Sequence, residues 1–190
     1  MAYYDIYDSF LYYSLRPETK AFIDGYGTTI KIKDHAVWIN KDVAIKVFDA
    51  RGIYSYELET QNLLSETGIF PPVLKTFEYE WEEKNNITRD GNITVIGDEN
   101  RGEYAIVSPY VGKNIRELFY TPTENNLFDG STITPLADSV PPVIKNRVYD
   151  LCRRMKNAGY YMADFRPNNF TLDLKGRVWA IDCGCVYKRS

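Results

Sequence analysis

The chain has 190 residues, of which 44% are hydrophobic and 26% are charged, an ordinary composition for one globular domain or two small lobes. Its formal net charge of -3 argues against general nucleic-acid binding, because neutralising phosphates requires a basic face. No apolar run is long enough to span a bilayer, and the N-terminus lacks the basic-then-apolar pattern of a secretory signal. We therefore expect neither a membrane nor a nucleic-acid partner.

The three cysteines, Cys152, Cys183 and Cys185, follow neither a zinc-site spacing nor a disulfide framework. A reducing compartment is the simplest setting for them, so we expect a cytoplasmic protein.

Short β-rich runs follow an N-terminal stretch with helical spacing. Residues 3–15 repeat aromatic and leucine side chains at helical intervals, which favours an extra helix docked on the body; a tyrosine-rich docking surface for a partner is the alternative. Strands are expected at 28–33, 36–39 and 43–48. A helix from about Tyr54 to Glu66 follows, with Gly68 as its C-terminal stop.

The rest of the chain alternates strands and helices. Strands are expected at 73–81, 92–96, 104–107, 170–172 and 178–181, and helices near 115–119 and over 143–157. A loop is expected at 82–90, a turn at 97–102 and a long loop at 120–142. This order predicts an α+β protein whose lobes meet at a hinge near 108–112, with a ligand cleft between them.

The C-terminal part carries the strongest chemical pattern. Asn169 lies five residues after Asp164 and directly before a strand, a turn and a second strand, after which comes Asp182. A hairpin of this length brings its ends together, so these three side chains should surround one small space. Two oxygen ligands together with phosphate oxygens suit Mg²⁺, and a separate carboxylate could accept the proton of an attacking hydroxyl. The alternative is that these residues cap turns beside the hairpin.

The stretch 164–169, followed by the triplet 182–184, resembles the catalytic loop and the metal-binding triplet of protein kinases, H-R-D-x-x-x-x-N and D-F-G. By this resemblance Asp164 is the catalytic base, Asn169 and Asp182 are metal ligands, and Arg166 faces the transferred phosphate.

A lysine in the middle of an apolar strand is the second pattern. Burying an unpaired ammonium is costly, so Lys46 needs a partner or must reach water from an edge strand. The resemblance implies that Lys46 binds nucleotide phosphates and pairs with a glutamate on the following helix. Glu59 is the first choice for that glutamate and Glu57 the second.

Two weaker patterns complete the resemblance. Gly25 and Gly27 precede Lys46 and resemble a G-x-G phosphate loop, although such a pair is also typical of a hairpin turn. Residues 104–112 resemble the strand and hinge that hold adenine, with backbone groups near Ser108 and Tyr110 as its ligands. Pro109 removes one donor from that segment.

The sequence also departs from the kinase pattern. Met162 and Ala163 replace the usual His and Arg, which predicts that no activation-segment phosphate controls the protein. Cys183 replaces the phenylalanine of D-F-G, as a small apolar filler. Few residues follow Gly184, so we expect the activation segment and later helices to be missing.

The resemblance therefore implies a two-lobed kinase-like fold: an N-terminal extension (1–20), a β-rich N-lobe (21–108), and a hinge with a truncated helical C-lobe (109–190). The implied activity is ATP- and Mg²⁺-dependent transfer of a phosphoryl group to a protein Ser or Thr hydroxyl. An ATP-binding or structural pseudokinase is the alternative, and a small-molecule kinase is a third possibility. Small kinases of this outline occur among bacterial effectors and viral or phage proteins, which implies by analogy an infection-related or virion-associated role.

Overall fold

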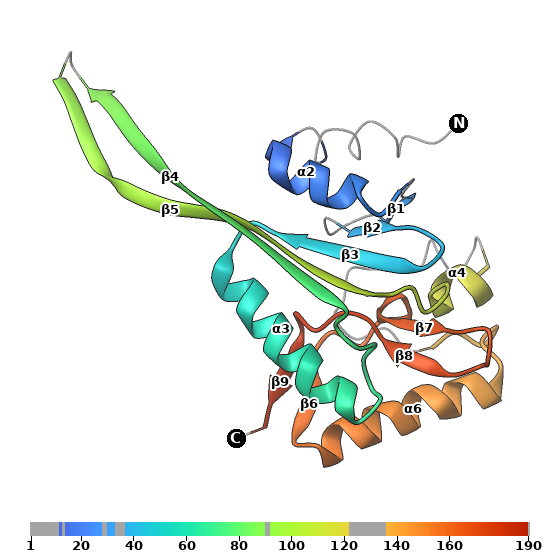
Figure 1. The fold of residues 1–190 in the computed structure, drawn as a ribbon. Helices are drawn as coiled ribbons and strands as arrows, with labels where there is room; N and C mark the ends of the chain where they lie inside the picture. Colours follow the sequence, from blue (N-terminus) through green and yellow to red (C-terminus); the bar gives the residue numbers. More distant parts are fainter. Residues whose placement is uncertain are drawn as a thin grey trace. The chain divides into compact units, whose positions relative to one another are not determined.

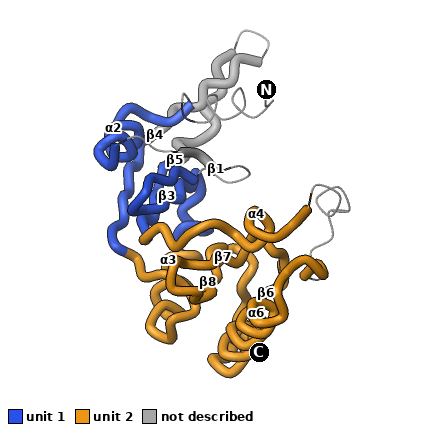
Figure 2. The backbone as a smooth tube through the Cα atoms, turned by 90° about the vertical axis from the view of Figure 1, so that its right-hand side faces the viewer, with its two compact units in different colours: residues 1–55, 74–108 blue, residues 56–73, 109–190 orange. Residues whose placement is uncertain are grey.

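The structure is a computed structural model, and it describes residues 12, 14–27, 30–32, 37–89, 92–121 and 136–189. The chain divides into two compact units (Figure 2), unit 1 with residues 1–55 and 74–108, and unit 2 with residues 56–73 and 109–190. The division at Ser108 falls at one end of the predicted hinge, but most of the helix after the lysine strand belongs to unit 2 rather than to a β-rich lobe. The predicted helix at 3–15 lies mostly outside the described residues.

Unit 1 is built on an antiparallel five-stranded sheet with the order β1-β2-β3-β5-β4 (Figure 1). Its strands are β1 (Ile30–Ile32), β2 (Val37–Ile39), β3 (Val43–Phe48), β4 (Lys75–Arg89) and β5 (Asn92–Pro109). The three short strands confirm the first three β-rich runs of the sequence. Buried side chains of β2, β3 and β5 join Ile23 of helix α2 (Pro17–Asp24) in one apolar cluster.

Alternate residues of β4 serve opposite faces of this sheet, as the pleat requires. On one face Phe77 stacks on Phe22 of α2, with ring centroids 4.5 Å apart. On the other face Glu78 accepts a hydrogen bond from the Tyr54 hydroxyl. Tyr54 in turn stacks on Tyr104, with centroids 5.1 Å apart.

The long β4–β5 hairpin corrects the predicted loop at 82–90 and the predicted turn at 97–102. The two strands pair from Lys75↔Val107 to Arg89↔Asn92, with one irregularity between Lys84 and Asn86. Polar composition misled the prediction, because a two-stranded ribbon can be polar on both faces. The dipeptide Asp90-Gly91 between the strands is the stronger signal, since Asp-Gly favours tight hairpin turns.

Unit 2 packs helices against two small strand pairs. Helix α3 (Arg51–Glu66) enters it from Tyr56 onward, and α4 (Ile115–Phe119) and α6 (Pro142–Asn157) follow. The strand β6 (Tyr160–Met162) pairs with β9 (Val186–Lys188), and β7 (Phe170–Leu172) pairs with β8 (Val178–Ala180). The β6–β9 pair was not predicted, whereas α6 and the β7–β8 hairpin were, within one residue at each end.

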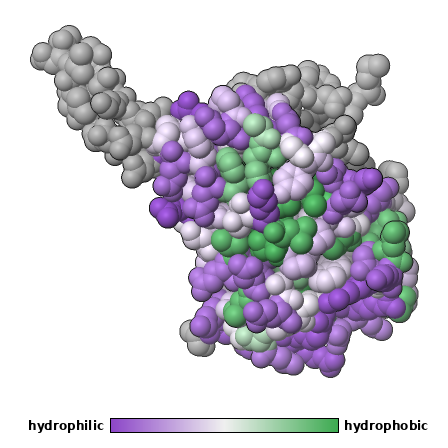
Figure 3. All heavy atoms as spheres, in the orientation of Figure 1, coloured by the Kyte–Doolittle hydropathy of each residue, from purple (hydrophilic) through white to green (hydrophobic). Residues whose placement is uncertain are grey.

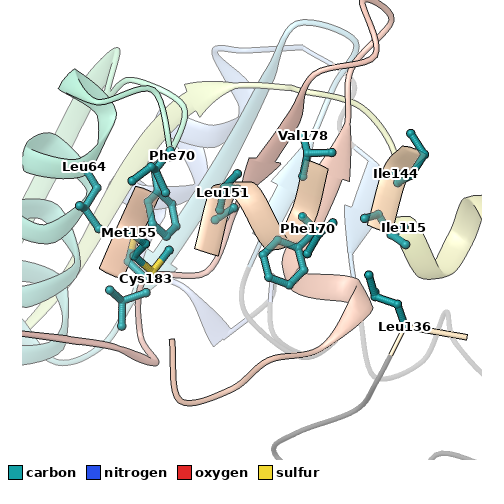
Figure 4. Packing of buried hydrophobic residues seen from close by; sticks show 14 of the residues in the cluster. Leu64, Phe70, Ile115, Leu136, Ile144, Leu151, Met155, Phe170, Val178 and Cys183 are labelled. Carbon is teal, nitrogen blue, oxygen red and sulfur yellow. The ribbon is translucent and has the colours of Figure 1, made fainter. Parts of the chain in front are cut away.

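One apolar cluster forms the core of unit 2 (Figure 4). Helix α6 contributes Ile144, Val148, Leu151 and Met155, all at helical spacing on one face. These side chains pack with Phe70, Phe170 and Cys183. The surface over α6 is mostly hydrophilic (Figure 3), as expected for the opposite face of an amphipathic helix.

The backbone at Gly112 packs closely against strand β7 of unit 2. Its φ of 98° suits glycine, and a Cβ at this position would collide with the carbonyl of Leu172.

None of the helices in the described part of the chain is both long and apolar enough to cross a membrane.

Candidate functional site

The loop between β6 and β7 holds Asn169 in one orientation. Residues Pro167–Asn169 form a short 3₁₀ helix (η1) that begins with proline, and Asn169 is buried, with 7% of its surface exposed. Its side-chain amide donates to the Asp164 carbonyl at 3.0 Å and to Asp164 Oδ2 at 3.2 Å. Because both bonds use the NH₂ group, the amide oxygen is left as an acceptor or ligand.

Arg166 forms a charge pair with the same aspartate. Its Nε lies 2.5 Å from Asp164 Oδ1, and the two side chains are only 24% and 14% exposed. The two atoms lack the alignment of a good N–H···O bond, so the contact is electrostatic rather than a directed hydrogen bond. One carboxylate therefore faces both a neutral amide and a guanidinium.

The β7–β8 hairpin brings Asp182 to this loop. Phe170 pairs with Ala180, and the Ile181 N–H donates to the Asn169 carbonyl at 3.1 Å, which extends the ladder by one step. Asp182 is the next residue along the chain. Its Oδ1 accepts a hydrogen bond from the Gly184 N–H at 3.1 Å, so the turn after the hairpin orients the carboxylate.

Asp173 organises the other end of the hairpin. Its Oδ1 accepts the Lys175 and Arg177 N–H groups, and its Oδ2 accepts the Trp179 indole N–H. Burial raises the pKa of this carboxyl, but these hydrogen bonds and the Arg177 charge outweigh burial and lower the pKa below its usual 3.8. The hairpin that places Asp182 thus depends on an ionised side chain at its turn.

A buried glutamate of α3 lies against the segment that follows Asp182. Glu57 is 5% exposed, and a Cβ placed on Gly184 would lie 2.8 Å from Glu57 Oε1 and 3.4 Å from Asp182 Oδ1. Glycine at 184 therefore permits this close approach.

Glu59, the first choice from the sequence, is exposed instead. The periodicity of α3 contains the signal for this difference. The buried positions are Tyr54, Glu57, Thr60, Gln61 and Leu64, which share one helical stripe that excludes Glu59.

The donors gathered here are hard oxygen atoms suited to Mg²⁺. Among the described residues there is no group of three or more His, Cys, Asp or Glu side chains that could hold a metal by itself. Mg²⁺ usually takes one or two protein oxygens and completes its shell with water and phosphate. The Asn169 amide oxygen and the Asp182 carboxylate fit that pattern. A metal that takes three or more of its ligands from His, Cys, Asp or Glu has no such group among the described residues.

Three further predicted residues lie on other segments of the chain. Lys46 is half-buried on β3, with its Nζ 5.3 Å from the centroid of the Phe48 ring. Ser108 is buried near the end of β5 in unit 1. Tyr110 is half-buried in unit 2, where burial and then the Glu117 charge raise the pKa of its hydroxyl.

The Gly25–Gly27 segment differs from a phosphate loop. Gly25 caps α2 with right-handed backbone (φ -59°), and its N–H donates to the Ala21 carbonyl. The Gly27 N–H donates to the Asp24 carbonyl. Because these N–H groups already serve the end of a helix, they are not available to phosphate oxygens.

Comparisons with known proteins return only a distant structural likeness. No protein-family model and no curated protein matches the chain. Among solved structures, WbdD in complex with a kinase inhibitor aligns at 16% identity and a TM-score of 0.47, over 84% of this chain and 32% of that one. The bifunctional kinase-methyltransferase WbdD aligns at 16% identity and a TM-score of 0.45, over 81% and 30%. This chain thus spans about a third of WbdD.

Proposed function

We propose that this protein is an ATP- and Mg²⁺-dependent phosphotransferase that transfers the γ-phosphoryl group to a hydroxyl, in the manner of a minimal protein kinase. The observation that carries the proposal is the Asn169 amide, whose two hydrogen bonds to Asp164 leave its oxygen beside the hairpin that delivers Asp182. Phosphoryl transfer needs one carboxylate to orient the attacking hydroxyl and separate oxygen ligands to hold the metal. Asp164 suits the first role, and Asp182 with Asn169 suits the second.

Each residue of the loop has a distinct role in this proposal. Asn169 and Asp182 hold Mg²⁺, which when bound supplies positive charge to the phosphate oxygens. Asp164 orients the attacking hydroxyl and accepts its proton. Arg166, already beside Asp164, stabilises negative charge on the transferred group. In unit 1, Lys46 is the proposed phosphate ligand, and the backbone near Ser108 is the proposed adenine contact.

The acceptor in this proposal is a Ser or Thr side chain of a partner protein. The Asp164 carboxylate is only 14% exposed, so the acceptor must bring its hydroxyl into a restricted space. A primary or secondary alcohol on an extended peptide meets that requirement.

Transfer of label from γ-labelled ATP to a mixed peptide library tests the proposal. Asp164→Asn and Asp182→Asn are expected to lower the rate by on the order of 100-fold or more, because each removes a charge that acts only at the reacting centre. Asp138→Asn is the matched control, since the side chain of Asp138 is fully exposed on unit 2. Wild-type activity in the Asp182→Asn variant would refute the assignment.

One observation favours a second function, an ATP-binding or structural protein without transfer. The backbone N–H groups of Gly25 and Gly27 donate to carbonyls at the end of α2, so fewer backbone donors remain to bind nucleotide phosphates. Thermal melting with Mg²⁺ and a non-hydrolysable ATP analogue separates these functions, because a bound ligand raises the melting temperature. A rise without transfer favours an ATP-binding protein, and no rise at millimolar nucleotide removes the phosphotransferase and favours a structural protein.

A further inference from the structure

Two consecutive residues of α3 contact the segment that follows Asp182. Glu57 lies against Gly184, as described above. Tyr56, directly before it, donates a hydrogen bond from its hydroxyl to the backbone carbonyl of Val186. All of these residues belong to unit 2. The helix therefore touches the chain at the second and the fourth residue after Asp182.

The same segment is tied to the loop that carries the other acid. Val186 pairs with Met162 in the β6–β9 ladder, and the Ala163 N–H donates to the Cys185 carbonyl at 2.8 Å. Ala163 is the residue directly before Asp164. Residues 183–186 are thus a bridge between Asp182 on one side and the Asp164 loop on the other.

The buried side chains of this bridge hold it against the core of unit 2, but they do not fix its position along α3. Cys183 and Val186 are buried in the apolar core of unit 2, with 2% and 0% of their surfaces exposed. Apolar packing is non-directional, so a small slide of the bridge along the core costs little. A hydrogen bond from a rigid aromatic side chain to one carbonyl is directional and removes that freedom.

We infer that Tyr56 is a positioning residue, whose hydroxyl holds the bridge 183–186 so that Asp182 keeps the place needed to bind the metal. This inference rests on the proposed function, because it assigns Tyr56 to the same site. Tyr56 touches no reacting atom; it acts on Asp182 through the Val186 carbonyl and the turn at Gly184.

A neighbouring tyrosine offers a matched control. Tyr187 is 44% exposed and Tyr56 is 39% exposed, so the two side chains are similarly accessible to solvent. The Tyr187 ring packs on Tyr161 at 5.7 Å, and within the described part of the chain its hydroxyl makes no hydrogen bond. Tyr187→Phe therefore removes an equivalent hydroxyl that has no place in the inferred role.

The experiment compares wild type, Tyr56→Phe and Tyr187→Phe in two readouts. The first is the Mg²⁺ concentration that gives half-maximal transfer at saturating ATP. The second is hydrogen exchange at the Ala163 and Val186 amides, which bond within the bridge. Tyr56→Phe is expected to raise the Mg²⁺ half-point and the exchange rates by ~2–10-fold, the size of one lost hydrogen bond. The maximal rate of Tyr56→Phe at saturating Mg²⁺ is expected to equal that of wild type. Tyr187→Phe is expected to match wild type in the Mg²⁺ half-point and in the exchange rates.

The outcomes separate this inference from the proposed function. An active wild type with an unchanged Mg²⁺ half-point in Tyr56→Phe overturns the inference and leaves the phosphotransferase intact. A loss in maximal rate with an unchanged half-point also overturns it, because general damage would act in that way. A wild type without metal-dependent transfer removes the proposed function and the metal role of Tyr56 together. In that case, unchanged exchange in Tyr56→Phe would show that the hydroxyl does not hold the bridge either.

Discussion

Two segments that the sequence associates with phosphate chemistry differ in what their polar groups already bond. In the Gly25–Gly27 segment, the backbone N–H groups donate to carbonyls at the end of α2. In the loop before β7, the Asn169 NH₂ group donates to Asp164, which leaves the amide oxygen for a ligand. A motif can therefore bind a ligand only where local folding leaves the required atom unused, and sequence spacing alone does not report that.

Removing the Asn169 side chain should have the largest effect. Asn169→Ala is expected to lower the rate of transfer by on the order of 100-fold, because it removes a proposed metal ligand and the partner of Asp164 together. Steady-state rates with labelled ATP check this. Asn168→Ala is the control, since the neighbouring Asn168 side-chain oxygen is buried without a hydrogen-bond partner. Equal rates in the two variants would contradict the distinction between these asparagines.

Breaking the turn of the β7–β8 hairpin should affect stability next. Asp173→Ala removes the acceptor of three hydrogen bonds and is expected to lower the free energy of unfolding by about 1–3 kcal/mol. Denaturant melts of the full chain measure this change. Lys175→Ala, at an exposed position of the same turn, should remain close to wild type. A loss as large in Lys175→Ala would mean that turn conformation, not the carboxylate, holds the hairpin.

The same aspartate predicts a contribution to acid sensitivity. The folded state holds the pKa of Asp173 below 3.8, so its stabilising contribution is present above that pH and is lost as pH falls through the lower, folded pKa. Wild type should lose stability faster than Asp173→Asn as pH is lowered below about 4. Melting temperatures from pH 6 to pH 2 test this, and parallel curves would contradict it.

At alkaline pH, unit 1 should respond through Tyr104. Burial, followed by the hydrogen bond to Glu80, raises the pKa of Tyr104 from 10.0 to about 12. Its contribution is complete below pH 10 and is lost as pH rises towards 12, because only the unfolded state ionises in that window. Tyr104→Phe should flatten this part of the melting curve. An unchanged alkaline slope in the variant would show that Tyr104 is not responsible.

The smallest effect is expected at the glycine pair. Gly25 has right-handed helical backbone that alanine adopts easily, and an added Cβ would lie 3.3 Å from the Phe22 carbonyl oxygen. Gly25→Ala should leave the KM for ATP within about twofold of wild type, since alanine adopts this φ readily and the contact with the Phe22 carbonyl requires only a small shift. A KM raised tenfold or more would show that this segment contacts the nucleotide phosphates, which would contradict the difference between it and the Asn169 loop.

The parts of the fold that were predicted correctly are those with local signals. The β7–β8 hairpin and α6 have clear periodicity and end at turn residues, so their bounds follow from the sequence. The β4–β5 ribbon has no apolar alternation along its polar half, and β9 is defined by pairing with β6, a partner distant in sequence. Pairings of this kind depend on tertiary contacts that no local window contains.

The site was predictable in composition but not in detail. The spacing of Asp164, Asn169 and the later Asp182 indicated one cluster, and the hairpin register brings Asn169 and the residue before Asp182 into contact. Glu57, and not Glu59, lies on the buried stripe of α3, while the choice between them as the partner of Lys46 stays a prediction. The Tyr56 bond to Val186 joins two backbone segments far apart in the chain, and nothing in the sequence pattern indicates it.

The central claim is that the Asn169 amide oxygen and the Asp182 carboxylate hold a divalent cation together with a nucleotide. Paramagnetic Mn²⁺, titrated with a non-hydrolysable ATP analogue, tests it directly by NMR through the side-chain NH₂ signals of Asn169. Those signals are expected to broaden at substoichiometric Mn²⁺ in wild type and in Asp138→Asn, but not in Asp182→Asn. Signals that stay sharp in wild type, or broaden equally in Asp182→Asn, would contradict the claim.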